Sequence, residues 1–391
     1  MTIQIEAAKK AALEVLLYNA RGPFDDLPRT AGWGYPEPYT RDLMIAGLGI
    51  LVSDNKTLIE SLDNVLKTMV RNQSPLGHIP SLVNDPENRG ASDTTPLFLL
   101  TAAIYQKVRG PKKYLQKAIK KALTWMEYQS PTNRALVAQM PTTDWRDEQW
   151  VIGFGLYVNT LVYCYLSLFN QQAKADNFRE NMNLPVTDEH SKNRSKLEGF
   201  RLNDKPYLAL WSYKIYNSDR FDLLGNSLAI LSGIVSEEQA GKIINWLEKE
   251  CQAMQTRKQL AILLPPNLLP YIEPQDHDWR QRYADFNKPG EYHNGGIWPF
   301  ICGFYIAALV AAKKIALAEK KLALLTELII PARQKKVSHG FNEWFKAQDG
   351  TPQGNDWQTW SAAMYLYAAE CVDRERTPFF EEVRQVNKSP F

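Results

Sequence analysis

Acidic, aromatic and amide side chains gather in a few short segments of the chain, nearly all of them just before an apolar stretch or at its start. Aromatic rings stack on the C–H faces of sugars, and carboxylates and amides bind sugar hydroxyl groups. Cleaving a glycosidic bond also requires two carboxyl groups, one to protonate the leaving oxygen and one to activate water or to attack. The segments therefore predict a carbohydrate site. Its candidate residues are Trp33, Tyr39, Arg41, Asp42, Asp93, Asp144, Trp145, Asp147, His293, Glu343, Gln358 and Trp360.

Each candidate also has a plain structural explanation. Asp42, Asp93 and Asp144 stand near expected helix starts, where an Asp cap stabilises a helix by ~1 kcal/mol. Trp360 is equally well a core residue, and His293 equally well a hydrogen-bonded structural histidine. The recurrence of such segments at successive helix starts, with aromatic or glycine neighbours, favours a shared site over isolated caps.

The elements that must position these residues are helices of two alternating kinds. One kind is apolar nearly all round, which is typical of buried helices, and the other has a single apolar face. The apolar stretches are 43–52, 96–105, 150–169, 223–234, 297–312 and 357–369. The one-faced stretches lie near 5–18, 58–69, 115–126, 170–183, 240–251 and 316–330, and residues 208–216 could be extended. Six of each in alternation predict an all-α (α/α)6 barrel of inner and outer helices, forming one catalytic domain over 1–391.

The lengths of the connections predict where the site lies. Connections from an apolar helix to the next one-faced helix are short, whereas those leading into apolar helices are long, at about 71–92, 129–147, 184–219, 253–295 and 331–356. All long loops must then meet at the end of the barrel where the inner helices begin. Long loops on a rigid scaffold are where function concentrates.

Composition excludes several other classes of protein. The 46 Lys and Arg against 43 Asp and Glu give a net charge of +3, too balanced for a protein that neutralises many phosphates of nucleic acid. The four cysteines are scattered, and none of the five histidines are three to five residues apart, so no metal site is expected. We expect no cofactor, and a small sugar as the partner. A homo-oligomer is left open.

Two uncharged stretches, 151–170 and 297–312, resemble membrane spans in length or hydropathy. They carry polar residues or lack the flanks of an anchored helix, so we expect both to be buried barrel helices. The first residues include Glu6, Lys9 and Lys10 where a signal peptide needs an apolar run. A cytoplasmic protein without a membrane partner is therefore expected.

Several motifs in order resemble those of the alkaline and neutral invertases, a family of glycoside hydrolases. Residues 292–299 read Y-H-N-G-G-I-W-P, similar to the family's Y-H-N-G-G-S-W-P, and residues 358–361 match its Q-T-W-S. Residues 144–147 read D-W-R-D where the family has D-W-I-D. Arg41–Asp42 corresponds to an R-D pair, and Asp93 falls in the place of another family aspartate. The resemblance runs from about residue 41 to the last inner helix.

This resemblance implies an (α/α)6 barrel that hydrolyses sucrose by inversion without a cofactor. It implies that Asp144 is the general acid and Glu343 the general base. With this pair we expect Asp42, Asp93, Asp147, His293 and Gln358 to hold the hydroxyl groups of the sugar, and Trp33, Tyr39 and Trp360 to form an aromatic wall. Arg41 and Trp145 are further expected substrate-binding residues. Glu148–Gln149 replace an Arg-Arg pair of the family, so glycosidase chemistry is better supported than sucrose as the substrate.

Alternatives from other classes stay open at this point. Related barrels release glucose from other α-glucosides, as an α-glucosidase or debranching-type hydrolase would. A sugar epimerase on the same barrel would rely on histidines, of which only His293 and His339 lie in the long loops. A non-catalytic carbohydrate-binding protein would need no acid–base pair, so Asp144 and Glu343 argue against it.

Overall fold

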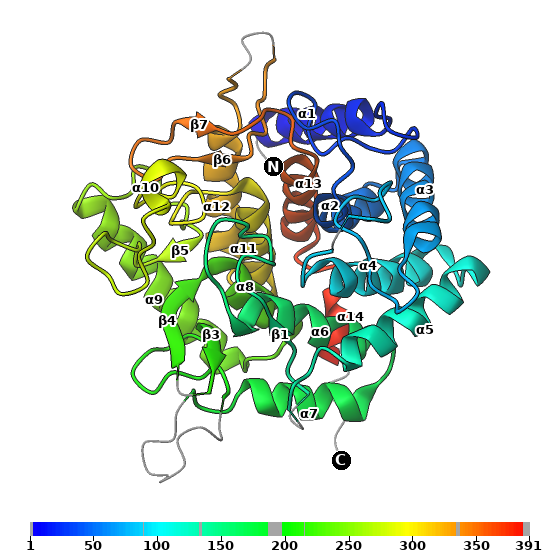
Figure 1. Ribbon diagram of the computed structural model, residues 1–391. Coiled ribbons are helices and arrows are strands. Elements are labelled where there is room, and N and C mark those ends of the chain that lie inside the picture. Colours follow the sequence, from blue (N-terminus) through cyan, green and yellow to red (C-terminus); the bar gives the residue numbers. More distant parts are fainter. Residues whose placement is uncertain are drawn as a thin grey trace.

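Six apolar helices stand side by side in a closed ring at the centre of the computed structural model (Figure 1). They are α2 (Thr40–Ser53), α4 (Thr94–Arg109), α6 (Leu156–Leu168), α8 (Leu223–Ser232), α11 (Pro299–Ala311) and α13 (Thr359–Arg374). Each contacts the next, and α13 contacts α2, which closes the ring. Every residue of α6 is buried, so nearly all-round apolarity leads to an inner position as expected. The structure describes residues 3–88, 90–132, 135–186, 198–214, 216–333 and 337–385.

The outer layer consists of helices with one buried face. They are α1 (Ile3–Asn19), α3 (Lys56–Asn72), α5 (Lys113–Glu127), α7 (Gln172–Met182), α9 (Glu237–Thr256) and α12 (Ile315–Leu328). In α3 the buried residues include Leu58, Leu62 and Met69, which recur at helical spacing. The all-α (α/α)6 architecture expected from the alternation is confirmed. Two short helices, α10 (Tyr283–Phe286) and α14 (Phe380–Gln385), complete the helical set of the described residues.

A small sheet ties together the loops that lead into three inner helices, α6, α8 and α11. Its antiparallel order is β1 (Ala138–Gln139), β2 (Gly153–Gly155), β3 (Ala209–Tyr213), β4 (Tyr216–Asp222) and β5 (Leu268–Leu269). The extended structure expected near 208–216 is thus confirmed. The helix expected from residue 150 begins only at Leu156, because residues 153–155 pair with neighbouring strands. A two-stranded pair, β6 (Trp344–Phe345) and β7 (Pro352–Gln353), follows later in the chain.

Two buried asparagines fasten this sheet to the ring in the same way. Asn159 in α6 accepts from the backbone N–H of Val137 and donates to its C=O, at 2.8 and 3.0 Å. Asn226 in α8 likewise accepts from the backbone N–H of Leu208 at 3.0 Å and donates to its C=O at 3.1 Å. Both asparagines are fully buried and occupy the fourth residue of their helix. Each therefore fixes the residue just before a strand, β1 or β3, against the start of an inner helix.

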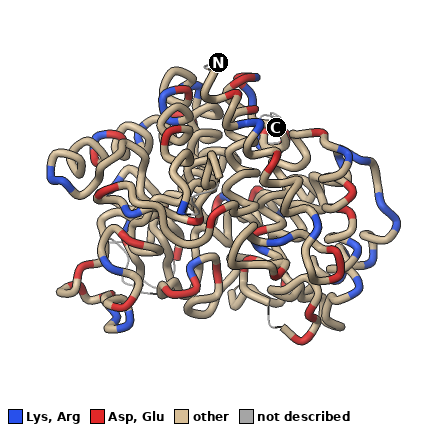
Figure 2. Tube along the Cα trace, turned by 90° about the horizontal axis from the view of Figure 1, so that it is seen from above, with Lys and Arg blue, Asp and Glu red and all other residues tan. Residues whose placement is uncertain are grey.

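Charges of both signs are interspersed around the outside of the molecule (Figure 2). The expected absence of a nucleic-acid partner nonetheless stays a prediction, as does the oligomeric state. Among the described residues, no helix has the length and apolarity needed to cross a membrane. Both uncharged stretches contribute to inner helices, α6 and α11. At the C-terminal end of the described chain, α14 packs on α6 and α8, with Phe380 buried.

We predict that Asn159→Ala and Asn226→Ala each lower the free energy of unfolding by about 2–4 kcal/mol, because each leaves a buried backbone N–H and C=O without a partner. Chemical denaturation measures this difference. Asn177→Ala, on the exposed side of α7, is the matched control and is expected to change stability by under about 0.5 kcal/mol. Losses as small as the control's would contradict the fastening role.

Candidate active site

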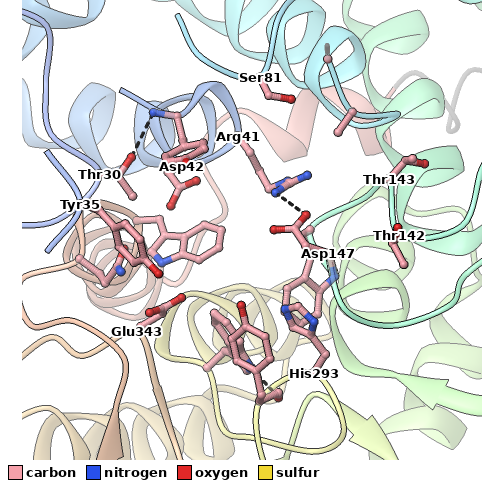
Figure 3. Close-up of a pocket in the computed structure, with 18 residues that line it drawn as sticks. Thr30, Tyr35, Arg41, Asp42, Ser81, Thr142, Thr143, Asp147, His293 and Glu343 are labelled. Atoms are coloured by element: carbon pink, nitrogen blue, oxygen red, sulfur yellow. Dashed lines mark hydrogen bonds and ion pairs between the residues drawn. The ribbon is translucent and has the colours of Figure 1, made fainter. Parts of the chain in front are cut away.

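The first residues of the inner helices and the loops before them enclose a cavity of about 400 Å³ (Figure 3). This lies within the usual range for small-molecule sites, roughly 300–1,000 Å³. Four of the five expected long loops therefore meet at one end of the barrel and form a concave site there, whereas no described residue of the loop near 184–219 lines it. The lining residues are Thr30, Tyr35, Tyr39, Arg41, Asp42, Ser81, Gly90, Ala91, Thr142, Thr143, Trp145, Asp147, Tyr292, His293, Trp298, Glu343, Gln358 and Trp360.

Most of the residues expected at the site do line this cavity. They are Tyr39, Arg41, Asp42, Trp145, Asp147, His293, Glu343, Gln358 and Trp360. Three expected residues do not line it: Trp33, Asp93 and Asp144. Trp33 instead packs on Tyr18 and Trp357, with ring centroids 5.9 and 4.7 Å apart. The aromatic wall expected from Trp33 is supplied by other rings.

Asp144 lies behind the cavity in a buried ion-pair network. Its carboxylate accepts from the guanidinium of Arg146 at 2.7 and 3.2 Å, from the Arg146 backbone N–H at 2.8 Å and from Gln139 at 3.2 Å. Arg146 also pairs with Asp222 at 3.3 Å, and all three charged residues are almost completely buried. Burial would raise the pKa of Asp144, but the pairing with Arg146 holds it below its usual value. These contacts do not favour the acid role expected for Asp144, which stays an untested prediction.

Asp93 is the buried partner of a cavity residue, not a cavity residue itself. Arg41, the second residue of α2, donates to both Asp93 oxygens at 2.5 and 3.2 Å, and to the backbone C=O of Asp144 at 2.7 Å. Its remaining terminal nitrogen stands 3.5 Å from Asp147. Asp93 occupies the N-cap of α4 without a side-chain capping bond, so the capping explanation does not account for it.

Three carboxyl groups face the cavity, and each has a raised pKa. Burial raises the pKa of Asp42 to about 8, against the opposing charge of Arg41. Burial raises the pKa of Glu343 to about 7, against a backbone hydrogen bond from Asn355. Desolvation by the surrounding walls raises the pKa of Asp147 to about 6, although Arg41 opposes it. Carboxyl groups that titrate near neutrality are typical of acid–base sites.

Aromatic rings and one histidine form the floor of the cavity. His293 stacks on both Tyr292 and Trp298, with centroids 3.9 and 5.6 Å away, and these two rings also contact each other at 5.4 Å. Its Nδ1 accepts from the backbone N–H of Glu148 at 3.4 Å, which leaves the ring proton on Nε2. Burial and the nearby Arg146 lower its pKa well below 6.5, so the imidazole is neutral and offers a hydrogen-bond donor.

Several lining residues were missed from the sequence. Tyr292 and Trp298 stand inside the Y-H-N-G-G-I-W-P motif, and Tyr35 stands inside the first aromatic segment. The sequence pattern around them could therefore have identified them as site residues. Thr30, Ser81, Gly90, Ala91, Thr142 and Thr143 are small residues of ordinary loop composition. Only the folded arrangement of the loops identifies them.

Part of the chain is similar to known proteins. Residues 215–375 match the alkaline and neutral invertase family. Cytosolic invertase 1 of Oryza sativa subsp. japonica is 29% identical over 154 residues, covering 38% of this chain and 25% of that protein. Alkaline/neutral invertase C, mitochondrial, of Arabidopsis thaliana is 25% identical over 175 residues, covering 43% and 24%. The chain thus spans about a quarter of the length of these curated relatives. Since their names cite different compartments, the expected cytoplasmic location stays a prediction.

Solved structures share the fold over nearly the whole chain. The GH63 mannosylglycerate hydrolase from Thermus thermophilus, in complex with Tris and D-glycerate, has a TM-score of 0.63 at 14% identity, covering 92% of this chain and 99% of that one. A bacterial glucoamylase complexed with acarbose has a TM-score of 0.60 at 14% identity, covering 98% and 58%. The family match includes His293, Glu343 and Gln358, and the resemblance seen in their motifs is confirmed. Residues 215–375 of this chain are thus similar to the alkaline and neutral invertases, and nearly the whole chain shares its barrel fold with solved glycosidases.

Proposed function

We propose that the protein hydrolyses the glycosidic bond of a small soluble sugar by inversion, with sucrose as the first candidate substrate and another α-glucoside as the second. The observation that carries the proposal is a pair of titratable carboxyl groups, Asp147 and Glu343, on opposite sides of the cavity opening (Figure 3). An inverting glycosidase needs such a pair with room for water between them. The family relationship supports the same chemistry.

We assign the proton donor to Asp147 instead of Asp144. The donor must reach the glycosidic oxygen, and the Asp147 side chain is 61% exposed at the cavity, whereas that of Asp144 is 1% exposed. Asp144 is also held ionised by Arg146, so it has no proton to give at neutral pH. Asp144 then acts as a positioning residue, since its pairing with Arg146 fixes the D-W-R-D segment that carries Asp147.

Glu343 is the proposed base that activates water. It is only 9% exposed, and it lies at the wall of the cavity near Tyr35. Because its pKa and that of Asp147 are both raised to near neutrality, a state with one proton on the pair is well populated there. The roles of donor and base are assigned from the positions of Asp147 and Glu343 in the cavity, and not from which of their two pKa values is higher.

Asp42 is proposed to bind a sugar hydroxyl as a neutral acid. With a pKa of about 8 it keeps its proton at neutral pH, so it donates as well as accepts. Together with Gln358 and the rings of Trp298 and Trp360, which also line the cavity, it would hold the glycosyl ring whose bond is cleaved. This combination of stacking faces and polar groups suits a pyranose.

The epimerase alternative gains no support from the cavity. His293 is neutral and hydrogen-bonded, and His339 is not among the lining residues. Proton transfer at carbon would therefore lack the histidines on which that alternative rests. Only a measurement of turnover distinguishes a non-catalytic sugar-binding protein from a hydrolase.

We predict that Asp147→Asn and Glu343→Gln each lower kcat/KM by roughly 10²–10⁴-fold, the usual contribution of a general acid or base. Proton NMR of sucrose, then of maltose, trehalose and small glucosides, follows the anomeric signals during turnover. Inversion at glucose would give β-glucose first. The control Asp54→Asn changes an exposed carboxylate at the C-terminal end of α2 and should retain full activity.

Two outcomes of this experiment would contradict the proposal. If the wild-type protein turns over none of these sugars and is indistinguishable from the Asp147→Asn variant, the hydrolase function is wrong. If an α-glucoside with a non-sugar leaving group gives α-glucose first, the mechanism is retaining and the proposed roles fail. From sucrose, α-glucose is also the product of cleavage at the fructosyl carbon, so sucrose alone does not decide this point.

We also predict that Asp42→Asn stabilises the protein increasingly as pH rises from 5 to 8. The folded pKa of about 8 lies above the unfolded value of about 3.9, so the folded state binds more protons and wild-type stability falls across this window. The fall is at most about 1.4 kcal/mol per pH unit, and an Asn escapes it. Thermal melts at both pH values measure the difference.

Asp144→Asn provides the opposite sign when the melts are extended to pH 2–4. Its folded pKa is lowered, so the carboxylate contributes stability above its unfolded pKa of about 3.9 and loses it as pH falls below that value. The variant should therefore be destabilised to the same extent at pH 5 and pH 8, and less so only below about pH 4. A pH-independent effect of Asp42→Asn would show that Asp42 is not held protonated.

A further inference from the structure

The cavity has two chemically different halves on either side of Asp147 and Arg41 (Figure 3). The aromatic half is defined by Tyr35, Asp42 and Glu343. The rings of Trp298 and Trp360 also line the cavity. The hydroxyl half is defined by Ser81, Thr142 and Thr143, with the backbone of Gly90 and Ala91 beside them. It offers hydroxyl groups, of which that of Thr143 donates to the Met140 carbonyl at 2.6 Å.

The position of Asp147 assigns these halves to the two parts of a substrate. A proton donor acts on the oxygen that joins the glycosyl ring to its leaving group. With the aromatic half holding the glycosyl ring, the leaving group would occupy the hydroxyl half. This assignment rests on the proposed function.

Arg41 is the single cationic side chain among the described residues that line the cavity. Its contacts with Asp93, Asp147 and the Asp144 carbonyl use four of its five N–H groups. At the edge of the site, Arg282 is likewise occupied by Glu148, at 2.7 and 2.8 Å. The described part of the cavity therefore has no guanidinium free to pair with an anionic ligand.

Carboxyl groups dominate the charge that a ligand meets. The titratable or charged groups at the cavity or packed behind it are Tyr35, Tyr39, Arg41, Asp42, Asp93, Asp144, Arg146, Asp147, Glu148, Tyr292, His293 and Glu343. Both arginines are balanced by their buried partners Asp93 and Asp144. An anion in the hydroxyl half would lose water without gaining a cation, and it would face ionised carboxylates.

We propose that this cavity accepts glycosides whose leaving group is an uncharged polyol or sugar, and rejects those whose leaving group carries a carboxylate or phosphate. The hydroxyl half presents uncharged polar groups, which suit a polyol. Because the guanidinium of Arg41 is already paired with Asp93 and Asp147, an anionic leaving group gains no cation there and is disfavoured.

The test compares two ligands that differ in charge and little in shape. Maltitol and maltobionate both carry an α-glucosyl ring, on a neutral alditol and on an aldonate respectively. Titration calorimetry needs no turnover, so its outcome is separate from that of the hydrolysis assay. At pH 8 we expect maltitol to bind at least about tenfold more tightly, a difference of about 1.4 kcal/mol. Equal binding, or no binding of either ligand, would overturn the proposal.

The pH dependence of this preference separates charge from shape. As Asp147 and Glu343 become protonated between pH 8 and pH 5, repulsion of the aldonate weakens while its own carboxylate stays ionised. The ratio of the two dissociation constants should therefore fall toward one at pH 5. A ratio that does not change with pH would indicate steric exclusion and contradict the charge argument.

Two variants at one position provide a matched pair. Thr142→Lys places a cation in the hydroxyl half and should improve maltobionate binding several-fold, whereas Thr142→Gln adds similar length without charge and should not. Arg89 lies outside the described residues, next to Gly90 in the sequence. Arg89→Gln should leave the ratio unchanged at pH 8; an increase would show that Arg89 pairs with anions and would overturn the proposal.

Discussion

The Arg41 guanidinium is the interaction on which the rest of the site depends. From the start of α2 it binds Asp93 at the N-cap of α4, and it binds the carbonyl of Asp144 in the loop that leads to α6. One side chain thus joins the beginnings of two neighbouring inner helices to the loop before a third. Its remaining contact reaches Asp147, so the side chain that holds the barrel mouth together also places the proposed donor.

Arg146 has a comparable role deeper in the barrel, behind the cavity wall. It is shared by Asp144 and Asp222, and burial raises the pKa of Asp222 despite the pairing. Both cations, Arg41 and Arg146, therefore have buried partners, and the carboxyl groups in front have none of equal strength. The same arrangement raises the pKa of the cavity carboxyl groups and disfavours anionic ligands. One distribution of charges therefore determines both the acidity of these carboxyl groups and the charge of the ligands that the cavity accepts.

The sequence predicted the architecture well, because helices buried all round and helices buried on one face differ in residue pattern. It also placed Glu343, His293 and Gln358 at one mouth. It did not show which carboxylates face solvent: Asp93, Asp144 and Asp147 look alike as residues, and only folding decides which of them an arginine takes. Helix α6 starts later than expected because β2 pairs with strands distant in sequence, a tertiary effect that local periodicity does not contain. Small lining residues such as Thr142 carried no pattern at all.

The identity of the proton donor is tested most directly with α-glucosyl fluoride, whose fluoride leaves with little need of protonation. Comparing its hydrolysis with that of the natural glycoside isolates the donor from the base. We predict that Asp147→Asn loses the glycoside activity but largely keeps the fluoride activity, while Glu343→Gln loses both. If instead Asp144→Asn loses the glycoside activity but keeps the fluoride activity, and Asp147→Asn does not, then Asp144 is the donor. The assignment of Asp147 as the donor would then be wrong.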